Sequence, residues 1–588
     1  MIFGKHINKF YLRYFLNFFI GILFLVLIDV IQLRVPEIIA NLTLANDMGA
    51  LTSKLIQESS MQIIIIGIIM FAGRFIWRIA ILGGSHHIAS DLREEMFEKS
   101  EQLSRRFYHE NKVGSLMAYF TNDLDTIQES FGWGTVMLVD SMFLSILSFY
   151  KMLKVNVKLT LICAIPLLGL CIFAYFVDVK IGKIYEERQN AFELMSEYTQ
   201  EIFTGLRVIK AFVREKREAA RFKKVNDNNK KKDIKLVKYS TFLDTGFEIL
   251  IEGMVVLGLT CGAIFIYQYV FEGGTEFVRA DMIEFNGYFN TIVWPMIALG
   301  QIVALRSRAK TSLRRISGLL DEKVELKDNH IDEIKKVNGS ITFNNFSYHY
   351  PDNDKLVLND ITLKIKSGEN VGIVGKIGSG KSTLISSLLR LDNYEKGQIF
   401  IDGVDIMSLP IKFVRDNIAY VPQDNFLFST SIEENVSFSK DELNEDEIIE
   451  ACEFADVHNN IVEFVEMYKT LVGERGTTLS GGQKQRISIA RAYIKKSPIM
   501  ILDDSLSAVD VKTEEKILAN IKNKRKNMTT IVVASRVSTV KDMDRIIVLN
   551  DGHIEAFDTH ENLLKCSKTY KRMSELQRLE SEANSYHG

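Results

Sequence analysis

Apolar residues gather in the first half of the chain, and a mixed pattern replaces them near residue 318. Six stretches in the first 310 residues are long and apolar enough for a membrane-crossing helix, which takes about 20 residues. They lie near 14–36, 61–82, 131–150, 159–178, 242–270 and 282–305. A buried helix of a soluble protein imitates one such stretch, but not six in succession. The pattern therefore predicts an all-α transmembrane domain of six helices over residues 1–320.

Basic residues between the spans predict the orientation. The long polar loop 179–241 holds 16 Lys and Arg, and loop 83–130 is also long and helix-favouring, whereas 37–60 holds only Lys54. Loops rich in Lys and Arg stay in the cytoplasm, so both long loops and both termini are expected inside the cell. The lysine-rich segment "KMLKVNVK" (151–158) would then be external and counts against this topology, but the long loops outweigh it. The N-terminal "MIFGKHINKF" lacks a small-residue cleavage site, which favours a first span over a signal peptide.

A few ionisable residues fall within the predicted spans, where they are costly and usually face a cavity or each other. Arg74 and Arg78 lie one helical turn apart on the second span, and Asp244, Glu248 and Glu252 share one face of the fifth. One hypothesis is that the two sets pair, or line an inward-facing cavity. The alternative is that these helix segments already lie in the cytosol as solvated extensions.

The second half has the pattern of a soluble α/β domain. Short strands such as "ITFNNFSYHY", "LVLNDITLKI" and "VGIVG" are separated by turn residues, which predicts a linker near 318–338 and a second domain over 338–580. The chain has 72 Lys and Arg against 74 Asp and Glu, and this balance argues against a nucleic-acid partner. Five cysteines (163, 171, 261, 452 and 566) show no metal-ligand or paired spacing, which indicates reduced thiols.

A phosphate-binding loop follows the third of these strands. "VGIVGKIGSGKST" (371–383) contains G-x-x-x-x-G-K-S between an apolar strand and a helix. Glycines let backbone N–H groups wrap phosphates, the lysine reaches the β- and γ-phosphates, and the serine hydroxyl ligates Mg²⁺. The motif predicts a site for a nucleoside triphosphate formed by Gly375, Lys376, Ile377, Gly378, Ser379, Gly380, Lys381, Ser382 and Thr383.

A second apolar strand, "PIMILDD" (498–504), ends in two carboxylates. Buried strands often end in Asp, so the feature alone is weak. Downstream of a phosphate loop it predicts the second element of the magnesium site, with Asp503 holding the ion through water.

The stretch "TTLSGGQKQR" (477–486) resembles the signature of ATP-binding cassette proteins. Ser480 and the backbone N–H groups that follow it, at the start of a helix, form a receptor for a γ-phosphate. The resemblance implies that the signature, Leu479, Ser480, Gly481, Gly482 and Gln483, serves the phosphate loop of a second subunit. It extends over nearly the whole chain and implies ATP and Mg²⁺ as ligands.

Further segments match the family residue by residue. Tyr350 matches the aromatic that stacks on adenine, Gln423 matches the loop that senses Mg²⁺ and the membrane domain, and Asp510 ends the "SAVD" loop that crosses the dimer interface. "TLVGERG" (470–476) resembles the element typical of exporter cassettes. "HENKVGSL" (109–116) and "EIFTGLRVIKAF" (201–212) resemble the two coupling segments, of which the second typically contacts the partner's cassette.

Two positions depart from the family pattern. Asp504 stands where relatives have the catalytic glutamate, and Ser535 stands in "VVASRVSTV" where they have the histidine that senses the γ-phosphate. A carboxylate withdrawn by one methylene loses reach to the attacking water, and serine lacks the reach and charge of imidazole. Either change alone is tolerable. The two changes together, beside an intact phosphate loop and an intact signature, predict a site that is kept for binding and relieved of catalysis.

This combination resembles one subunit of the heterodimeric bacterial multidrug exporters. The resemblance implies that Lys381, Ser382, Asp503 and Asp504 build a degenerate ATP site, and that Leu479–Gln483 completes the partner's active site. Two alternatives stay open: a homodimeric drug or lipid exporter in which Asp504 is a slow base, and an ATP-binding regulatory membrane subunit. An apolar cavity with a few charges favours amphipathic substrates, although lipid-facing helices need the same residues. Abundant Lys, Ile and Asn indicate a bacterium of low-GC coding, and the six spans then predict a multi-pass protein of its plasma membrane.

Overall fold

A computed structural model describes the chain except for residues 1–3, 112, 274–275, 329–335, 351–354, 441, 443, 474–475, 477 and 586–588. The chain divides into two compact units, one formed by 1–101 with 112–322 and the other by 102–111 with 323–588. The first is helical and the second is an α/β domain, which confirms the predicted fold class. Part of the predicted linker, 329–335, lies outside the described residues.

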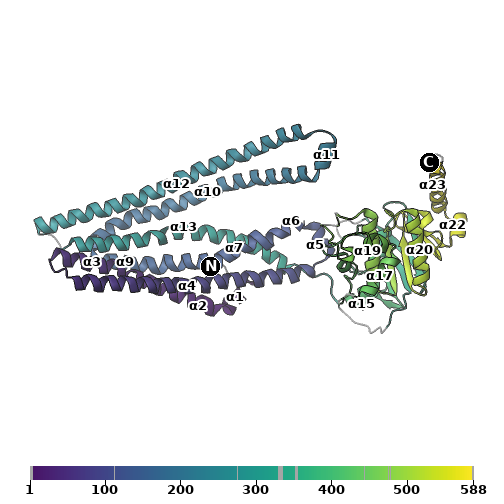
Figure 1. Cartoon of the computed structure of the whole chain (residues 1–588), viewed down its shortest axis with the longest axis horizontal. Helices are drawn as coiled ribbons and strands as arrows, with labels where there is room; N and C mark the ends of the chain where they lie inside the picture. The colour runs from purple at the N-terminus through teal and green to yellow at the C-terminus, as the bar shows by residue number, and fades with distance from the viewer. Residues whose placement is uncertain are drawn as a thin grey trace. The chain divides into compact units, whose positions relative to one another are not determined.

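Helices account for the first unit (Figure 1). Four of its segments are long and apolar enough to cross a membrane, namely Phe15–Asp47, Ser53–Glu101, Val113–Val155 and Glu248–Glu272, within the part of the chain that was described. Continuous helix also covers the fourth and sixth predicted spans, 159–178 and 282–305. The helices are α1 (Asn8–Arg13), α2 (Phe15–Gln32), α3 (Arg34–Asp47), α4 (Ser53–Glu101), α6 (Val113–Ala118), η1 (Tyr119–Asp123), α7 (Leu124–Phe131), α8 (Trp133–Val139), η2 (Asp140–Leu144), α9 (Ser145–Val155), α10 (Val157–Thr204), α11 (Leu206–Ala211), α12 (Glu215–Glu272) and α13 (Arg279–Asp321).

Small residues let the first two long helices approach closely. A Cβ on Gly21 of α2 would lie 2.3 Å from Cγ1 of Ile81 on α4, and one on Gly73 of α4 would lie 3.0 Å from Ile28 of α2. Membrane helices pack through such small residues because lipid offers no hydrophobic force between helices. Close van der Waals packing at these glycines therefore holds α2 and α4 together.

Helices α10 and α12 form a long hairpin closed by α11 (Figure 1). Charged pairs link its two arms outside the apolar stretches: Arg188 Nε donates to Asp233 Oδ1 at 2.8 Å, and Lys232 and Lys235 both donate to Glu187 at 2.9 Å. The two lysines hold the pKa of Glu187 down, at about 2. The hairpin is thus tied together where water surrounds it.

Two sheets form the second unit. The larger has the order β10-β9-β3-β8-β7-β6, parallel from β9 to β6, and the smaller has the order β2-β1-β4-β5 and is antiparallel. Strands β7 and β8 are buried at every position, as expected for a parallel sheet covered on both faces. The strands are β1 (Ile341–Tyr348), β2 (Leu358–Ile365), β3 (Asn370–Gly375), β4 (Ile399–Ile401), β5 (Val404–Asp405), β6 (Ile418–Val421), β7 (Ile499–Asp503), β8 (Thr529–Val533), β9 (Arg545–Asn550) and β10 (His553–Asp558).

Helices cover these sheets, and a short segment from the first half of the sequence, α5 (Arg105–Glu110), belongs to the same unit. The others are α14 (Lys381–Ser387), η3 (Ile406–Ser408), α15 (Ile411–Asp416), α16 (Ile432–Val436), α17 (Glu445–Phe454), α18 (His458–Val462), η4 (Met467–Lys469), α19 (Gly481–Tyr493), α20 (Val511–Lys524), α21 (Val537–Val540), α22 (His560–Cys566) and α23 (Lys568–Ser585).

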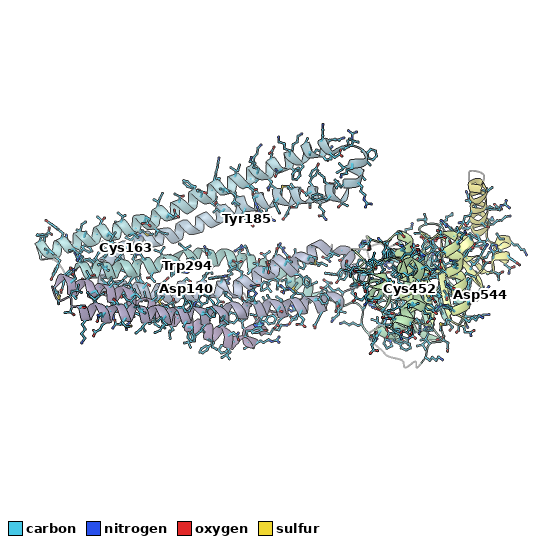
Figure 2. The ribbon with its side chains drawn as sticks, viewed as in Figure 1. Asp140, Cys163, Tyr185, Trp294, Cys452 and Asp544 are labelled. Atoms are coloured by element: carbon cyan, nitrogen blue, oxygen red, sulfur yellow. The ribbon has the colours of Figure 1, made fainter. Side chains whose placement is uncertain are left out.

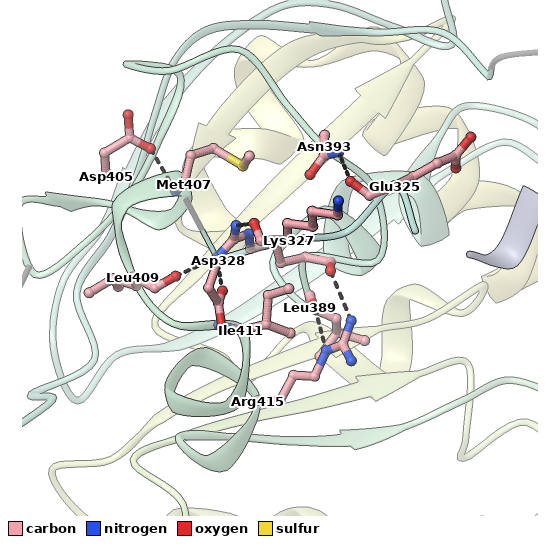
Figure 3. A network of polar contacts seen from close by, with 11 residues as sticks. Glu325, Lys327, Asp328, Leu389, Asn393, Asp405, Met407, Leu409, Ile411 and Arg415 are labelled. Carbon is pink, nitrogen blue, oxygen red and sulfur yellow. Dashed lines mark hydrogen bonds and ion pairs between the residues drawn. The ribbon is translucent and has the colours of Figure 1, made fainter. Parts of the chain in front are cut away.

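A buried arginine fastens the segment that enters the second unit, and its partners Lys327, Asp328 and Leu409 are labelled in Figure 3. Arg390 is 1% exposed; it donates to Asp328 Oδ1 at 3.2 Å, to the Lys327 carbonyl at 3.1 Å and to the Leu409 carbonyl. Asp328 also accepts from the backbone N–H of Ile411 at 2.9 Å. A buried guanidinium needs such partners because an unpaired charge is costly. We call Asp328 and Arg390 the linker clamp.

Candidate functional site: a nucleotide pocket at the ends of the parallel strands

The carboxyl ends of four neighbouring strands carry the predicted catalytic residues. The phosphate loop follows β3, Ser535 follows β8, Asp503 and Asp504 close β7, and Gln423 follows β6, and these strands are adjacent in the sheet. Ligands of open α/β sheets bind at this edge. The topology therefore brings residues from 375 to 535 to one place.

The phosphate loop adopts a conformation that only glycine permits at several positions. A Cβ on Gly375 would lie 2.2 Å from the Leu549 carbonyl oxygen, and Gly378 and Gly380 have φ of +82° and +95°. Lys381 Nζ donates to the carbonyls of Gly375 and Lys376, both at 2.9 Å. The ammonium group is thus held over the loop, where it can reach a phosphate.

Other atoms of the loop are free to meet a ligand. The Ser379 hydroxyl is buried and has no hydrogen-bond partner among the described residues, whereas Lys376 and Ile377 are exposed. Burial lowers the pKa of Lys381, and the carboxylates of Asp504 and Asp503 oppose this effect. These donors fit the phosphates of a nucleotide.

Asp503 and Ser382 form a pair of hard oxygen ligands. Ser382 Oγ donates to Asp503 Oδ1 at 3.1 Å, and the Tyr420 hydroxyl donates to Oδ2 at 3.3 Å. Burial raises the pKa of Asp503, and the two hydroxyls partly offset the shift. Hydroxyl and carboxylate oxygens are what Mg²⁺ prefers, so the donor set fits this ion. Gln423, the third residue predicted at the metal, is exposed.

The two positions that depart from the family pattern contact each other. Ser535 Oγ donates to Asp504 Oδ1 at 3.4 Å, and the Asp504 N–H donates to the Val533 carbonyl at 3.0 Å. Asp504 has φ of +45°, in the left-handed region that Asp enters more readily than most residues. The Asp504 carboxylate therefore faces the Ser535 hydroxyl.

Tyr350 contacts Thr383, which lies in α14 directly after the phosphate loop. The Tyr350 hydroxyl and Thr383 Oγ1 are 2.9 Å apart, and the Tyr350 ring packs edge-on against Tyr348 with centroids 5.3 Å apart. An aromatic side chain tied to the phosphate loop is positioned to flank a base. The following residues, 351–354, lie outside the described part of the chain.

The signature segment forms the start of α19. Ser480 caps the helix in a reciprocal pair: its hydroxyl accepts from the Gln483 N–H at 3.2 Å, and the Gln483 side chain accepts from the Ser480 N–H at 2.9 Å. Leu479 is buried, and no Cβ contact would restrict Gly481. Among the described residues no hydrogen bond joins Leu479–Gln483 to the phosphate loop of the same chain. The segment preceding it, "TLVGERG", includes 474–475, which lie outside the description.

Asp510 plays a structural part in this chain. Its Oδ1 accepts from the Thr513 N–H at 3.0 Å and so caps α20, and these backbone contacts lower the pKa of Asp510. The neighbouring Ala508 N–H donates to Gln485 Oε1 at 3.1 Å. This contact fixes the 507–510 loop to the signature helix.

Tyr420 and Gln485 were not anticipated from the sequence. Tyr420 lies on β6 and reaches across to Asp503 on β7, and Gln485 reaches from α19 to the loop after β7. For Tyr420 the only signal is its place on the strand before Gln423. Neither role follows from a motif, since both depend on which elements are neighbours.

The hypothesis that Arg74 and Arg78 pair with the fifth-span acids is not met within one chain. No ion pair among the described residues joins them to Glu248 or Glu252; all four side chains are exposed, and Arg78 lies over the Trp77 ring at 5.4 Å. The side chain of Asp244 lies outside the description. Pairing fails because α4 packs on α2, whereas α12 packs on α10.

A bundle of membrane helices joined in one chain to an ATPase-type α/β domain defines a membrane protein with a nucleotide-binding domain. Residues 18–296 match the family model of the ABC transporter transmembrane region, and residues 358–507 match the family model of the ABC transporter. The chain therefore belongs to the ABC transporter family, as a half-transporter that carries one membrane region and one ATP-binding cassette.

Several bacterial proteins are similar over the full length. The "Probable multidrug resistance ABC transporter ATP-binding/permease protein YheI" of Bacillus subtilis is 33% identical over 98% of this chain and 97% of its own. The "Multidrug resistance-like ATP-binding protein MdlA" of Escherichia coli is 30% identical over 95% and 93%. A solved structure, of a bacterial Atm1-family ABC exporter with ATP bound, has the same fold, with a TM-score of 0.76, 24% identity and coverage of 97% of this chain and 99% of that one.

Proposed function

We propose that this chain is one half of a heterodimeric exporter that uses ATP to move amphipathic compounds out across the bacterial plasma membrane. The names of the relatives, which describe multidrug resistance proteins, support this substrate class. The loop charges described above support the orientation, with the cassette and both termini in the cytoplasm. The bilayer and a second half-transporter are its partners, and nucleic acid is not.

The tip of the α10–α12 hairpin supports assembly with a second subunit. Around α11 the side chains of Phe203, Val208, Phe212 and Val213 are 71%, 60%, 71% and 81% exposed. Contiguous exposed apolar surface beyond the membrane marks an interaction site. Residues 109–111 of the first coupling segment, 109–116, belong with the chain's own cassette, whereas the second coupling segment, at the hairpin tip, does not, which supports docking of the tip on the cassette of the partner.

The contact between Asp504 and Ser535 is the observation that most directly supports a degenerate ATP site in this chain. A general base must lie within hydrogen-bond reach of the proton that it takes, and here the carboxylate is one methylene short and accepts from Ser535 Oγ at 3.4 Å. A serine in place of histidine holds no positive charge toward a γ-phosphate. We therefore assign this chain's own site to binding ATP and slow or no hydrolysis.

Each residue then has a part in one of two composite sites. Lys381 and the loop N–H groups would hold the phosphates, Ser382 and Asp503 would hold Mg²⁺ with Gln423, and Tyr350 would flank the adenine. Bound Mg²⁺ neutralises charge on the β- and γ-phosphates. The signature, Leu479–Gln483, would complete the partner's active site, with Asp510 at the interface between the cassettes. Closure of the cassettes on ATP would drive outward opening.

The experiment compares ATP turnover by this chain alone with turnover by the chain joined to a second half-transporter that keeps the glutamate and the histidine. We expect turnover to rise at least tenfold in the pair. The double variant Asp504→Glu, Ser535→His should add turnover at this chain's own site, because it restores a base of full reach. Equal turnover with and without the partner would overturn the heterodimer and leave a homodimeric exporter. ATP binding without turnover or transport in any pair would indicate a regulatory subunit.

A further inference from the structure

Two carboxylic acids lie buried among the membrane helices. Asp29, on α2, is 4% exposed, and Asp140, at the start of η2 in the third span, is 9% exposed. Elements α2 and η2, which carry these two residues, pack against each other. Ionisable groups at such places are costly and usually functional.

The hydrogen bonding of the pair is incomplete. Asp140 Oδ2 accepts from the Trp294 indole N–H of α13 at 3.3 Å, and Figure 2 shows these two residues side by side. Asp140 Oδ1 and Asp29 Oδ2 are buried and have no partner among the described residues. Two acceptors without a donor in a low-dielectric interior are unfavourable, because each has lost its water.

Among the described residues, no ion pair joins a basic side chain to Asp29 or Asp140. On the elements packed around α2 and η2, Arg74 and Arg78 of α4 are exposed, Glu37 of α3 pairs with Lys151 of α9 at 3.2 Å, and Glu284 of α13 accepts from Tyr288. The helix α8 carries no charged side chain.

We propose that Asp29 and Asp140 bind one proton, held as a carboxylic acid on Asp29 beside a carboxylate on Asp140. A proton on Asp29 Oδ2 removes a buried charge that has no partner among the described residues, and the Trp294 N–H stabilises the charge that remains on Asp140. Two carboxylates that share a site cannot both ionise easily.

The occupant is a proton rather than a metal ion, since a metal needs more ligands. No group of three or more His, Cys, Asp or Glu that fits a metal ion occurs among the described residues. Three elements meet here, α2, η2 and α13, and the π-helical turn that Asp140 begins is a type of irregularity common at functional sites. If the chain exports as proposed above, movement of these helices during the cycle would release and recover this proton.

Infrared spectroscopy of the full-length protein in lipid nanodiscs tests the site without requiring transport. We expect a carboxylic-acid C=O band that persists at pH 7.5, about 3.6 pH units above the ordinary pKa of Asp, and that shifts in D₂O. Asp29→Asn should remove the band. Asp47→Asn, at an exposed carboxylate that pairs with Arg279 at 2.7 Å, should leave it unchanged. Absence of the band in the unmodified protein, or its persistence in both Asp29→Asn and Asp140→Asn, would overturn the proposal.

Two further measurements complete the test. The first distinguishes a bound proton from a bound alkali ion, and the second distinguishes failure of this proposal from failure of the proposed function. Exchange of choline for Na⁺ should leave the band unchanged, and loss of the band on adding Na⁺ would overturn the proton in favour of a metal cation. With the partner half-transporter present, the acidic limb of the pH profile of ATP turnover should flatten in Asp29→Asn. A band without ATP turnover in any pair would contradict the export function but keep the proton site.

Discussion

Asp503 is a buried carboxylate that accepts hydrogen bonds from Ser382 and Tyr420. Because burial raises its pKa, the ionised form is disfavoured in the nucleotide-free cassette, and the stability contributed by the protonated form is lost as the pH rises through the raised pKa. Asp503→Asn removes this charge. At neutral pH we expect the nucleotide-free protein to melt at the same or a higher temperature.

The same variant should lose the extra stabilisation that Mg²⁺ adds to ATP, since an amide is a poorer ligand for the ion. Thermal unfolding with ATP plus Mg²⁺, and with ATP plus EDTA, measures this difference. The two melting temperatures should coincide in Asp503→Asn and differ in the unmodified protein. A lower melting temperature without nucleotide, together with an unchanged Mg²⁺ effect, would contradict the assignment.

For single residues, the sequence predicted which positions belong to the nucleotide site better than it predicted which of their side chains contact each other. The motifs located Lys381, Ser382 and Asp503, and the structure brings Ser382 and Asp503 together, because the strand–loop–helix unit of β3 and the end of β7, two strands away, lie at the same edge of the sheet. The bond between Ser535 and Asp504 and the bond from Tyr420 to Asp503 depend on the register of β6, β7 and β8. That register is fixed by packing across the sheet.

Among the elements, the linker clamp is the contact most sensitive to a single change. Asp328→Ala removes the carboxylate partner of a guanidinium that is 1% exposed and leaves Arg390 with carbonyl acceptors. Hydrogen bonds to charged groups contribute about 1.5 kcal/mol or more. We expect a fall of roughly 4 °C in the melting temperature of the cassette, measured by scanning calorimetry.

A matched control tests the same chemistry at the surface. Asp416 pairs with Lys412 at 2.7 Å on α15, and both side chains are exposed. Asp416→Ala should change stability by about 0.5 kcal/mol or less, because surface ion pairs contribute little. Equal effects of Asp328→Ala and Asp416→Ala would show that the clamp does not hold the linker.

Hydropathy located the membrane helices but not their full extent or their irregularities. The predicted span 61–82 is part of one helix, Ser53–Glu101, because the polar residues after 82 keep a helical pattern that a window of apolar residues does not register. The π-helical turn Asp140–Leu144 left no sign in the sequence. Such a turn is set by packing against α2 and α13, which lie far away along the chain.

For the whole molecule, the hairpin tip is the place where coupling to a partner can be broken without touching either ATP site. Phe212 is 71% exposed, so Phe212→Glu should fold normally while placing a charge in the apolar contact. In the assembled pair we expect transport and the stimulation of ATP turnover by substrate to fall at least fivefold. Asn228→Glu, which adds the same charge to an exposed position of α12, is the control and should change neither. Unchanged transport in Phe212→Glu would contradict docking of the tip.

The composite sites of the pair predict an asymmetry between two substitutions in this chain. A side chain on Gly481 meets no atom within 4 Å, and a negative charge at a helix N-terminus favours folding, so Gly481→Asp should fold while repelling the γ-phosphate that the signature receives. Since that phosphate belongs to the partner's active site, turnover by the pair should fall at least 100-fold. Lys381→Met, in the degenerate site, should lower turnover less than tenfold. Steady-state ATP hydrolysis by the two variants, each with the same partner, measures the ratio. If Lys381→Met is the more damaging of the two, this chain's own phosphate loop holds the hydrolysed ATP and the assignment of the sites is reversed.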